Sequence, residues 1–164
     1  TEEIVLQEHL GDEDSEYTCT VVTCGGEPSS AAVLQRWLRA GDTYRVVPVR
    51  NEEIERYVVQ AARALAALGA VGSCNFQLRL DRGVPKIFEI NARFSGTTPL
   101  CAELGMNPVE SYLKRHLGLA YDGAVRTDVV ILRHWAELVV PRERFDALSR
   151  DGRALAPVVR RGTL

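Results

Sequence analysis

The chain has 164 residues, of which 46% are hydrophobic and 26% are charged, a composition typical of an ordinary globular domain. Its formal charge of -2 at pH 7 gives no basic excess, so neither nucleic acid nor an acidic membrane surface is indicated as a partner. No apolar run approaches the roughly 20 residues that a membrane-spanning helix needs, so we expect no membrane segment.

The four cysteines form no Cys-x-x-Cys pair and lie in apolar or alternating runs. We therefore expect reduced thiols in a cytoplasmic protein rather than disulfide bonds or a zinc site. The sequence opens on Thr1 rather than Met and runs directly into a strand-like segment, from which we expect it to be part of a longer protein.

The first expected elements are strands. Residues 4–10 form a short apolar run with a polar end, which predicts a buried strand before the acidic loop 11–15. Residues 16–24 alternate and are rich in β-forming residues, and they stop at a Gly-Gly-Glu-Pro turn, so a second strand is expected there. Residues 29–39 are ambiguous, because their alanines favour a helix whereas the preceding turn favours a returning strand.

Two helices carry clear boundary signals. In residues 51–69, Asn51 can cap the helix, two glutamates follow in the first turn, and Gly69 ends it. One apolar stripe is expected to pack on the sheet: Ile54, Val58, Ala61, Leu65 and Leu68. A second helix is expected after Asn107, with proline at its first position and Gly118 beyond its end.

The C-terminal part gives weaker signals. Residues 129–140 are interpreted as a long strand or a bent pair of strands, and residues 142–149 as a short helix. His116 lies in the final turn of the helix expected after Asn107, and we interpret it as a residue that is structural or complements the helix dipole rather than as a catalyst. His134 and Glu137 have no partners at the spacing of a metal site or a catalytic triad, so we interpret them as structural.

The most informative stretch is residues 75–93, two alternating segments joined by a turn of Asp, Arg, Gly, Val and Pro. If Leu80 pairs with Lys86, antiparallel register fixes the other pairs. These are Arg79–Ile87, Gln77–Glu89 and Asn75–Asn91, all on one face. The residues expected on the opposite, core-facing side are Phe76, Leu78, Leu80, Phe88 and Ile90.

The polar face of this hairpin offers ligands that a hard cation prefers. Gln77, Glu89 and Asn91 supply amide and carboxylate oxygens, which suit Mg²⁺, and the guanidinium of Arg93 can bind a phosphate oxygen. The alternative is a half-exposed hairpin whose polar face is only solvated. The loop 94–99, with its small and hydroxyl-bearing residues, favours the functional interpretation.

Together, Asn-x-Gln at 75–77 and Phe-Glu-Ile-Asn-Ala-Arg-Phe-Ser-Gly-Thr-Thr-Pro at 88–99 resemble the metal-binding end of the ATP-grasp superfamily. The likeness is to the large subunit of carbamoyl phosphate synthetase and its short homologues. It implies that Gln77, Glu89 and Asn91 hold Mg²⁺ or Mn²⁺ on the phosphates of ATP, with Arg93 as a catalytic residue. Ala92 stands where many members have proline, which leaves the ligands unchanged.

The resemblance also implies where the nucleotide binds. Four consecutive residues correspond to the hinge against which adenine lies, with Glu8 on a ribose hydroxyl: Gln7, Glu8, His9 and Leu10. Glu16 corresponds to a residue near the sugar or the phosphates, the alternative being an exposed strand end.

The same resemblance decides in favour of a strand at residues 29–39. Such a strand brings Arg36 or Arg39 toward the phosphates. We favour Arg39 as the catalytic arginine, because it immediately precedes a Gly-Asp-Thr turn where relatives carry a basic residue or histidine. An arginine that is only solvated at a strand edge is the alternative.

The implied fold is an α+β domain with a mainly antiparallel sheet. Residues 1–118 would form the C-terminal lobe of an ATP-grasp enzyme, and residues 119–164 an extension that packs on the same domain. The implied chemistry is ADP-forming ligation, in which a carboxylate attacks the γ-phosphoryl group of ATP and an amine or another nucleophile captures the acyl phosphate. The family's first subdomain has no counterpart in the sequence, so we expect weak ATP binding and no turnover from this chain alone.

Two further hypotheses stay open. One is a non-catalytic nucleotide-binding or interaction module, and the other is a lobe similar to that of biotin carboxylase. The expected partners are ATP, a small carboxylate and an amine, and a homodimer is a possible assembly.

Overall fold

The computed structural model describes residues 4–134 and 139–152. The chain divides into two compact units, Thr1–Arg133 and His134–Leu164. Residues of the expected 119–164 extension therefore fall in both units. Those up to Arg133 belong to the first unit, where Val125, Val129 and Ile131 pack against buried core residues. The second unit contains helix α4 (Arg142–Asp151), close to the helix expected at 142–149.

The first unit is built on an antiparallel sheet of seven strands, counted over the described residues, in the order β6-β5-β1-β3-β4-β7 with β2 paired to β1. The strands are β1 (Glu16–Cys24), β2 (Glu27–Pro28), β3 (Ala32–Arg39), β4 (Asp42–Pro48), β5 (Gly72–Asp81), β6 (Val84–Asn91) and β7 (Ile131–Leu132). The predicted α+β class with a mainly antiparallel sheet is confirmed.

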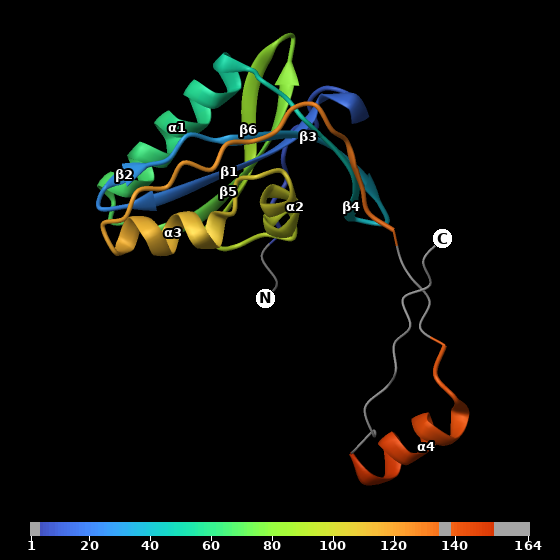
Figure 1. Ribbon diagram of the computed structural model, residues 1–164. Helices are drawn as coiled ribbons and strands as arrows, with labels where there is room; N and C mark the ends of the chain where they lie inside the picture. Colours follow the sequence, from blue (N-terminus) through green and yellow to red (C-terminus); the bar gives the residue numbers. More distant parts are fainter. Residues whose placement is uncertain (1–3, 135–138, 153–164) are drawn as a thin grey trace. The chain divides into compact units, whose positions relative to one another are not determined.

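Helices cover both faces of this sheet (Figure 1). Helix α1 (Glu52–Ala67) packs on one face, and α2 (Thr98–Glu103) and α3 (Pro108–His116) lie on the other. A short 3-10 helix, η1 (Glu13–Ser15), precedes β1. None of the helices in the described ranges is long and apolar enough to cross a membrane.

The predicted helix caps are confirmed. The side chain of Asn51 accepts hydrogen bonds from the backbone N–H groups of Glu53 and Ile54 at the start of α1. Asn107 does the same at the start of α3, where Pro108 occupies the first turn. These bonds satisfy donors that have no partner within the helix. The stripe of α1 is as expected except at Leu68, which follows the helix and is 85% exposed.

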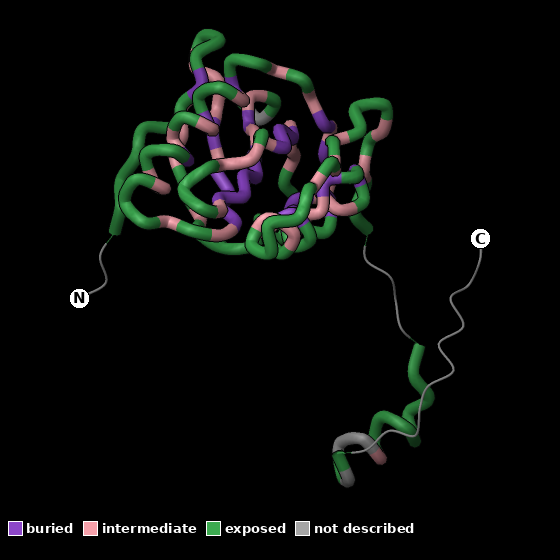
Figure 2. Tube along the Cα trace, turned by 60° about the vertical axis from the view of Figure 1, so that its left-hand side comes forward, coloured by how far each residue is buried: buried purple, intermediate pink, exposed green. Residues whose placement is uncertain are grey.

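Each face of the sheet has its own core, and Figure 2 shows the buried segments in purple in the interior of the first unit. Beneath α1 the buried residues are Cys19, Val21, Val33, Ile54, Val58, Ala62, Cys74, Phe76 and Leu78. On the other face they are Ala32, Leu34, Val46, Leu100, Cys101, Leu104 and Met106. Burial raises the pKa of the Cys101 thiol to about 11, so this thiol stays protonated at neutral pH and acts as a core residue.

Two predicted strands differ from the structure. Residues 4–10 form no strand, and Ile4, Val5 and Leu6 are 83%, 77% and 92% exposed. A strand needs a neighbour for its backbone hydrogen bonds, and no strand of the described chain pairs with this segment. Residues 129–140 contain only the short β7, and residues 135–138, including Glu137, lie outside the described residues.

Candidate functional site

The sheet face opposite α1 carries polar side chains in rows that run across the strands. Residues that are paired across an antiparallel sheet point to the same face. The rows on this face contain the pairs Glu16–Arg79, Thr18–Gln77, Gln77–Glu89 and Asn75–Asn91. The predicted register of Gln77 with Glu89 and of Asn75 with Asn91 is therefore confirmed.

Nearer the hairpin turn, the predicted register is wrong by one residue. The turn consists of residues 82–83, both with positive φ, and Arg79 pairs with Lys86 instead of Ile87. The register shifts between Gln77 and Leu78, and this shift leaves Phe88 of β6 as the extra residue of a β-bulge. Ile87 consequently packs against the core beneath α1 rather than lying on the polar face.

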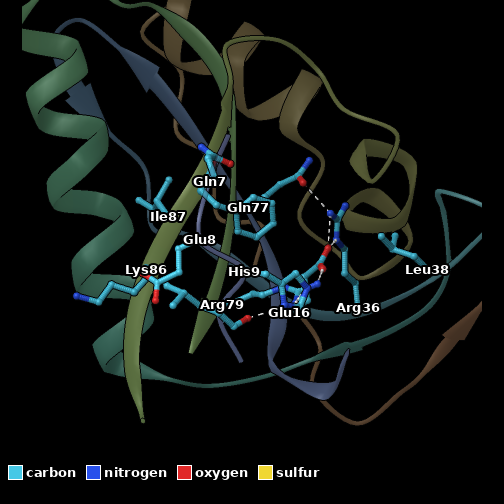
Figure 3. Close-up of a pocket in the computed structure, with 12 residues that line it drawn as sticks. Gln7, Glu8, His9, Glu16, Arg36, Leu38, Gln77, Arg79, Lys86 and Ile87 are labelled. Atoms are coloured by element: carbon cyan, nitrogen blue, oxygen red, sulfur yellow. Dashed lines mark hydrogen bonds and ion pairs between the residues drawn. The ribbon is translucent and has the colours of Figure 1, made fainter. Parts of the chain in front are cut away.

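A pocket of about 510 Å³ lies over this part of the sheet (Figure 3). Its lining residues are Gln7, Glu8, His9, Leu10, Glu16, Arg36, Leu38, Gln77, Arg79, Lys86, Ile87 and Phe88. All five residues predicted to contact the nucleotide line this pocket, and one of the three predicted metal ligands does so as well. Their binding roles stay predictions.

The centre of the pocket is an ion-pair row that spans three strands and that we call the arginine row: Arg36 on β3, Glu16 on β1 and Arg79 on β5. Glu16 is 5% exposed. Its two carboxylate oxygens lie 2.6 Å from Nη2 of Arg36 and 2.7 Å from Nη2 of Arg79. Burial raises the pKa of Glu16, but the hydrogen bonds and charges of the two arginines outweigh it, so this pKa lies below its usual value of 4.5.

The arginine row also holds the neighbouring segments (Figure 3). Nη1 of Arg79 lies 2.6 Å from Nε2 of His9 and donates a hydrogen bond of 3.2 Å to the carbonyl oxygen of Leu10. Because a guanidinium can only donate, Nε2 of His9 is the acceptor in this contact. Nη2 of Arg36 donates to Oε1 of Gln77 at 2.7 Å.

The bulge contributes to the same site. Nε2 of Gln7 donates a hydrogen bond of 3.0 Å to the carbonyl oxygen of Phe88. The segment 7–10 is thus bound to β6 at one end and to Arg79 at the other, without forming a strand.

Three residues at the end of β6 form a second polar group, which we call the β6 ligand set: Glu89, Asn91 and Arg93. Nδ2 of Asn91 donates to Oε1 of Glu89 at 2.7 Å, and Nη2 of Arg93 donates to Oδ1 of Asn91 at 3.3 Å. Glu89 and Arg93 are exposed, and Glu89 lies opposite Gln77 on the adjacent strand. The β6 ligand set therefore adjoins the pocket at Gln77.

A family model described as "ATP-grasp in the biosynthetic pathway with Ter operon" matches residues 1–137 of the chain. The chain belongs to this ATP-grasp family. The superfamily predicted from residues 75–99 is therefore confirmed, whereas the finer likeness to carbamoyl phosphate synthetase stays a prediction. No curated protein matches the chain.

Three solved structures illustrate the fold that this chain shares with known enzymes. The ATPase subunit of phosphoribosylaminoimidazole carboxylase from Aquifex aeolicus has a TM-score of 0.61 and 13% identity, over 84% of this chain and 46% of that one. An L-amino acid ligase from Bacillus licheniformis has a TM-score of 0.52 and 19% identity, over 72% of this chain and 34% of that one. The N5-carboxyaminoimidazole synthase from Aspergillus clavatus, in complex with ADP and 5-aminoimidazole ribonucleotide, has a TM-score of 0.53 and 20% identity, over 66% and 31%. This chain spans between about a third and a half of these proteins.

Of the three residues expected to bind Mg²⁺, two offer side-chain oxygens that suit the ion and one suits it less well. Glu89 offers an exposed carboxylate, and Asn91 offers an amide whose Oδ1 would join it once the amide turns. In the described ranges, no group of three or more His, Cys, Asp or Glu side chains could hold a metal ion. Mg²⁺ at a nucleotide site needs only one or two protein carboxylates, because nucleotide phosphates and water complete its coordination. Gln77 fits less well, since its only side-chain oxygen accepts from Arg36.

The two candidate arginines of β3 lie in different surroundings. Arg36 lines the pocket, whereas Arg39 is exposed and stacks on the ring of Tyr44, with 4.6 Å from its guanidinium carbon to the ring centroid. A catalytic role for Arg39 stays a prediction without support from this placement. The pairing of Leu34 with Thr18 puts Arg36 on the face that carries Glu16. This pairing is not encoded in the local sequence, so alternation alone could not choose between Arg36 and Arg39.

Proposed function

We propose that this chain is the ATP- and Mg²⁺-binding lobe of an ADP-forming ATP-grasp ligase that works through an acyl phosphate. The observation that carries the proposal is the pocket between residues 7–10 and Gln77, which borders the carboxylate of Glu89 on the next strand. Membership of the ATP-grasp family and the fold shared with ligases support the same function.

In this proposal the nucleotide lies along the pocket. Adenine contacts the segment 7–10, which is held by Arg79 at the carbonyl oxygen of Leu10 and by the side chain of Gln7 at Phe88. The phosphates extend toward Gln77 and Glu89. The nucleotide complex of the Aspergillus clavatus enzyme supports ADP as the class of ligand. Bound Mg²⁺ would neutralise phosphate charge and orient the γ-phosphoryl group.

The reaction needs positioning and charge neutralisation more than covalent help from the protein. A carboxylate oxygen of the substrate forms a bond to the γ-phosphorus while the bond to ADP breaks. The amine then forms a bond to the acyl carbon, and inorganic phosphate leaves. Arg93 binds phosphate oxygens with its two-pronged guanidinium, and Glu89 and Asn91 hold the cation beside it.

A non-catalytic nucleotide-binding or interaction module is the second candidate. The hydrogen bond between Arg36 and Gln77 favours it, because this bond occupies one of the three expected metal ligands. The two candidates differ in whether bound ATP is converted to ADP when a carboxylate and an amine are supplied.

Calorimetric titration with Mg-ATP tests the proposal, using the wild type, Glu89→Gln and the control Glu53→Gln, which changes an exposed residue in the first turn of α1. We expect the wild type and the control to bind alike, and Glu89→Gln to bind Mg-ATP about tenfold more weakly or worse. A wild type that binds no Mg-ATP would falsify the proposed lobe. Equal binding by Glu89→Gln would instead show that the cation is held elsewhere.

The ligase is separated from the alternatives by ADP release from the longest available form of the protein. The assay supplies amino acids with ammonium in one arm and bicarbonate in another. ADP release that depends on the carboxylate and the amine supports the ligase. ADP release with bicarbonate alone supports a lobe similar to that of biotin carboxylase. Mg-ATP binding without ADP release in any arm supports the non-catalytic module.

A further inference from the structure

Arg36 occupies the oxygen at which the family resemblance expects a metal ion. Its Nη2 lies 2.7 Å from Oε1 of Gln77, and its Nε donates to Oε1 of Glu16 at 2.8 Å. The Arg36 side chain is 11% exposed, so these bonds lie on the wall of the pocket rather than in solvent. The other polar atom of the Gln77 amide is a nitrogen that donates hydrogen bonds and cannot hold a cation.

A Mg²⁺ ion on the same oxygen would place two positive centres on one acceptor. Their repulsion is strong where water is largely excluded. Glu16 relieves it only in part, because its single negative charge is shared between Arg36 and Arg79. Glu89 accepts from no guanidinium in the described structure. Oδ1 of Asn91 accepts from Nη2 of Arg93, but this contact is longer, at 3.3 Å, and Arg93 is exposed, so water screens the charge of Arg93 and lets its side chain move away.

The remaining nitrogen of Arg36 points to a role for this side chain. Within the residues that the structure describes, Nη1 of Arg36 has no hydrogen-bond partner, while Nε and Nη2 are held by Glu16 and Gln77. A guanidinium fixed on two of its nitrogens and free on the third is prepared to donate to a phosphate oxygen.

We infer that Arg36 replaces the cation expected at Gln77: the nucleotide-bound Mg²⁺ is held by Glu89 and Asn91 without Gln77, and Arg36 binds the phosphates directly. Glu16 and Gln77 are positioning residues that hold the guanidinium of Arg36. This inference rests on the proposed function, because it concerns how the same nucleotide is bound. It makes the site a one-metal site with an arginine beside it.

The test measures how many Mn²⁺ ions bind to the full chain in the presence of a non-hydrolysable ATP analogue, and how tightly they bind. Electron paramagnetic resonance reports the concentration of free Mn²⁺. We expect one Mn²⁺ per complex in the wild type. Gln77→Leu should leave its affinity within about twofold, whereas Glu89→Gln should weaken it about tenfold. Two Mn²⁺ ions in the wild type with one lost in Gln77→Leu, or equal losses in Gln77→Leu and Glu89→Gln, would overturn the inference.

A second measurement tests Arg36 itself by calorimetric titration of the analogue at fixed Mn²⁺. Arg36→Leu should weaken the analogue about tenfold, as for loss of a charged hydrogen bond, without changing the number of Mn²⁺ ions. Arg36→Lys keeps the charge and should recover part of the loss. Unchanged binding in Arg36→Leu contradicts a phosphate contact.

The positioning role of Gln77 predicts non-additivity. Gln77→Leu should weaken the analogue less than Arg36→Leu does, and the double variant should bind like Arg36→Leu alone, because Gln77 acts only through Arg36. Additive losses in the double variant overturn that role. Circular dichroism confirms that each variant is folded. A wild type that binds neither the analogue nor Mn²⁺ rejects the proposed function itself, whereas the outcomes above reject only this inference.

Discussion

The arginine row and the β6 ligand set lie on the same face of one sheet, yet they are held in opposite ways. The side chains of the arginine row are 7% to 16% exposed and bond across three neighbouring strands. The β6 ligand set is largely exposed, and its hydrogen bonds join residues two positions apart on one strand and the segment after it.

This difference separates groups that the fold fixes from groups that a ligand would fix. Buried charges must be paired, so the arginine row forms part of the folded structure whether or not a ligand is bound. Exposed oxygens keep most of their capacity to accept, so Glu89 and Asn91 stay available for a cation. Substitutions in the arginine row should therefore lower stability, with Arg36 also affecting the nucleotide, whereas substitutions in the β6 ligand set should affect ligand binding with little change in stability.

The largest expected effect is on Glu16. Glu16→Ala leaves two poorly hydrated guanidinium groups without their carboxylate, and we expect a loss of about 3 kcal/mol in the free energy of unfolding. Glu89→Ala should change it by less than about 0.5 kcal/mol. Urea denaturation of both variants measures the contrast. If the two substitutions cost the same, burial of the arginine row does not set its contribution.

Acid should weaken the same row. The pKa of Glu16 is lowered in the folded protein, so its stabilising contribution is complete above the usual value of 4.5 and is lost as the pH falls through the lower, folded pKa. The free energy of unfolding of the wild type should therefore decrease as the pH falls below 4.5. The matched variant Glu16→Gln cannot ionise and should show a smaller pH dependence over that interval. Parallel curves for the two proteins would contradict this assignment.

The hairpin shows what alternation and pairing can predict. Period-two alternation placed Gln77 and Glu89 on the same face correctly, because polar and apolar residues must face opposite sides of the sheet. Their pairing was deduced from a Leu80–Lys86 pair, whereas Leu80 pairs with Pro85, and the bulge restores the deduced register at Gln77.

Near the turn the predicted pairing was wrong by one residue, because a two-residue turn and a bulge at Phe88 change the register. Neither feature alters the hydrophobic pattern of the sequence. The shift appears in the observed pairing of Arg79 with Lys86 and in the packing of Ile87 against the core.

The arginine row shows a limit of a different kind. Glu16 was predicted to contact the nucleotide, but its partners Arg36 and Arg79 come from strands 20 and 63 residues further along the chain. Such a row depends on which strands become neighbours, and that order is not local information. The strand predicted from the apolar run at residues 4–10 was wrong for a related reason, since hydrophobicity alone does not supply a neighbouring strand to pair with.

A smaller effect is expected at Arg93, in the β6 ligand set. Arg93→Ala removes an exposed guanidinium, so the free energy of unfolding should change by less than about 0.5 kcal/mol. If Arg93 binds phosphate as proposed, Mg-ATP should bind about tenfold more weakly. Calorimetry at low and high salt measures this loss, with Arg63→Ala on an exposed position of α1 as the control. Equal losses in both variants would indicate only a general effect of charge.

The smallest expected effect is on an ion pair outside the site. Glu110 and Lys114 lie 2.8 Å apart on α3, one helical turn apart, with side chains 48% and 37% exposed. Solvent already screens this pair, so Glu110→Gln should lower the midpoint of thermal unfolding by less than about 1 °C. Glu16→Gln is the matched comparison, because the same carboxylate becomes the same amide at a buried position. If the two variants lose similar stability, the number of ion pairs rather than their burial controls stability, and the contrast between the arginine row and the β6 ligand set fails with it.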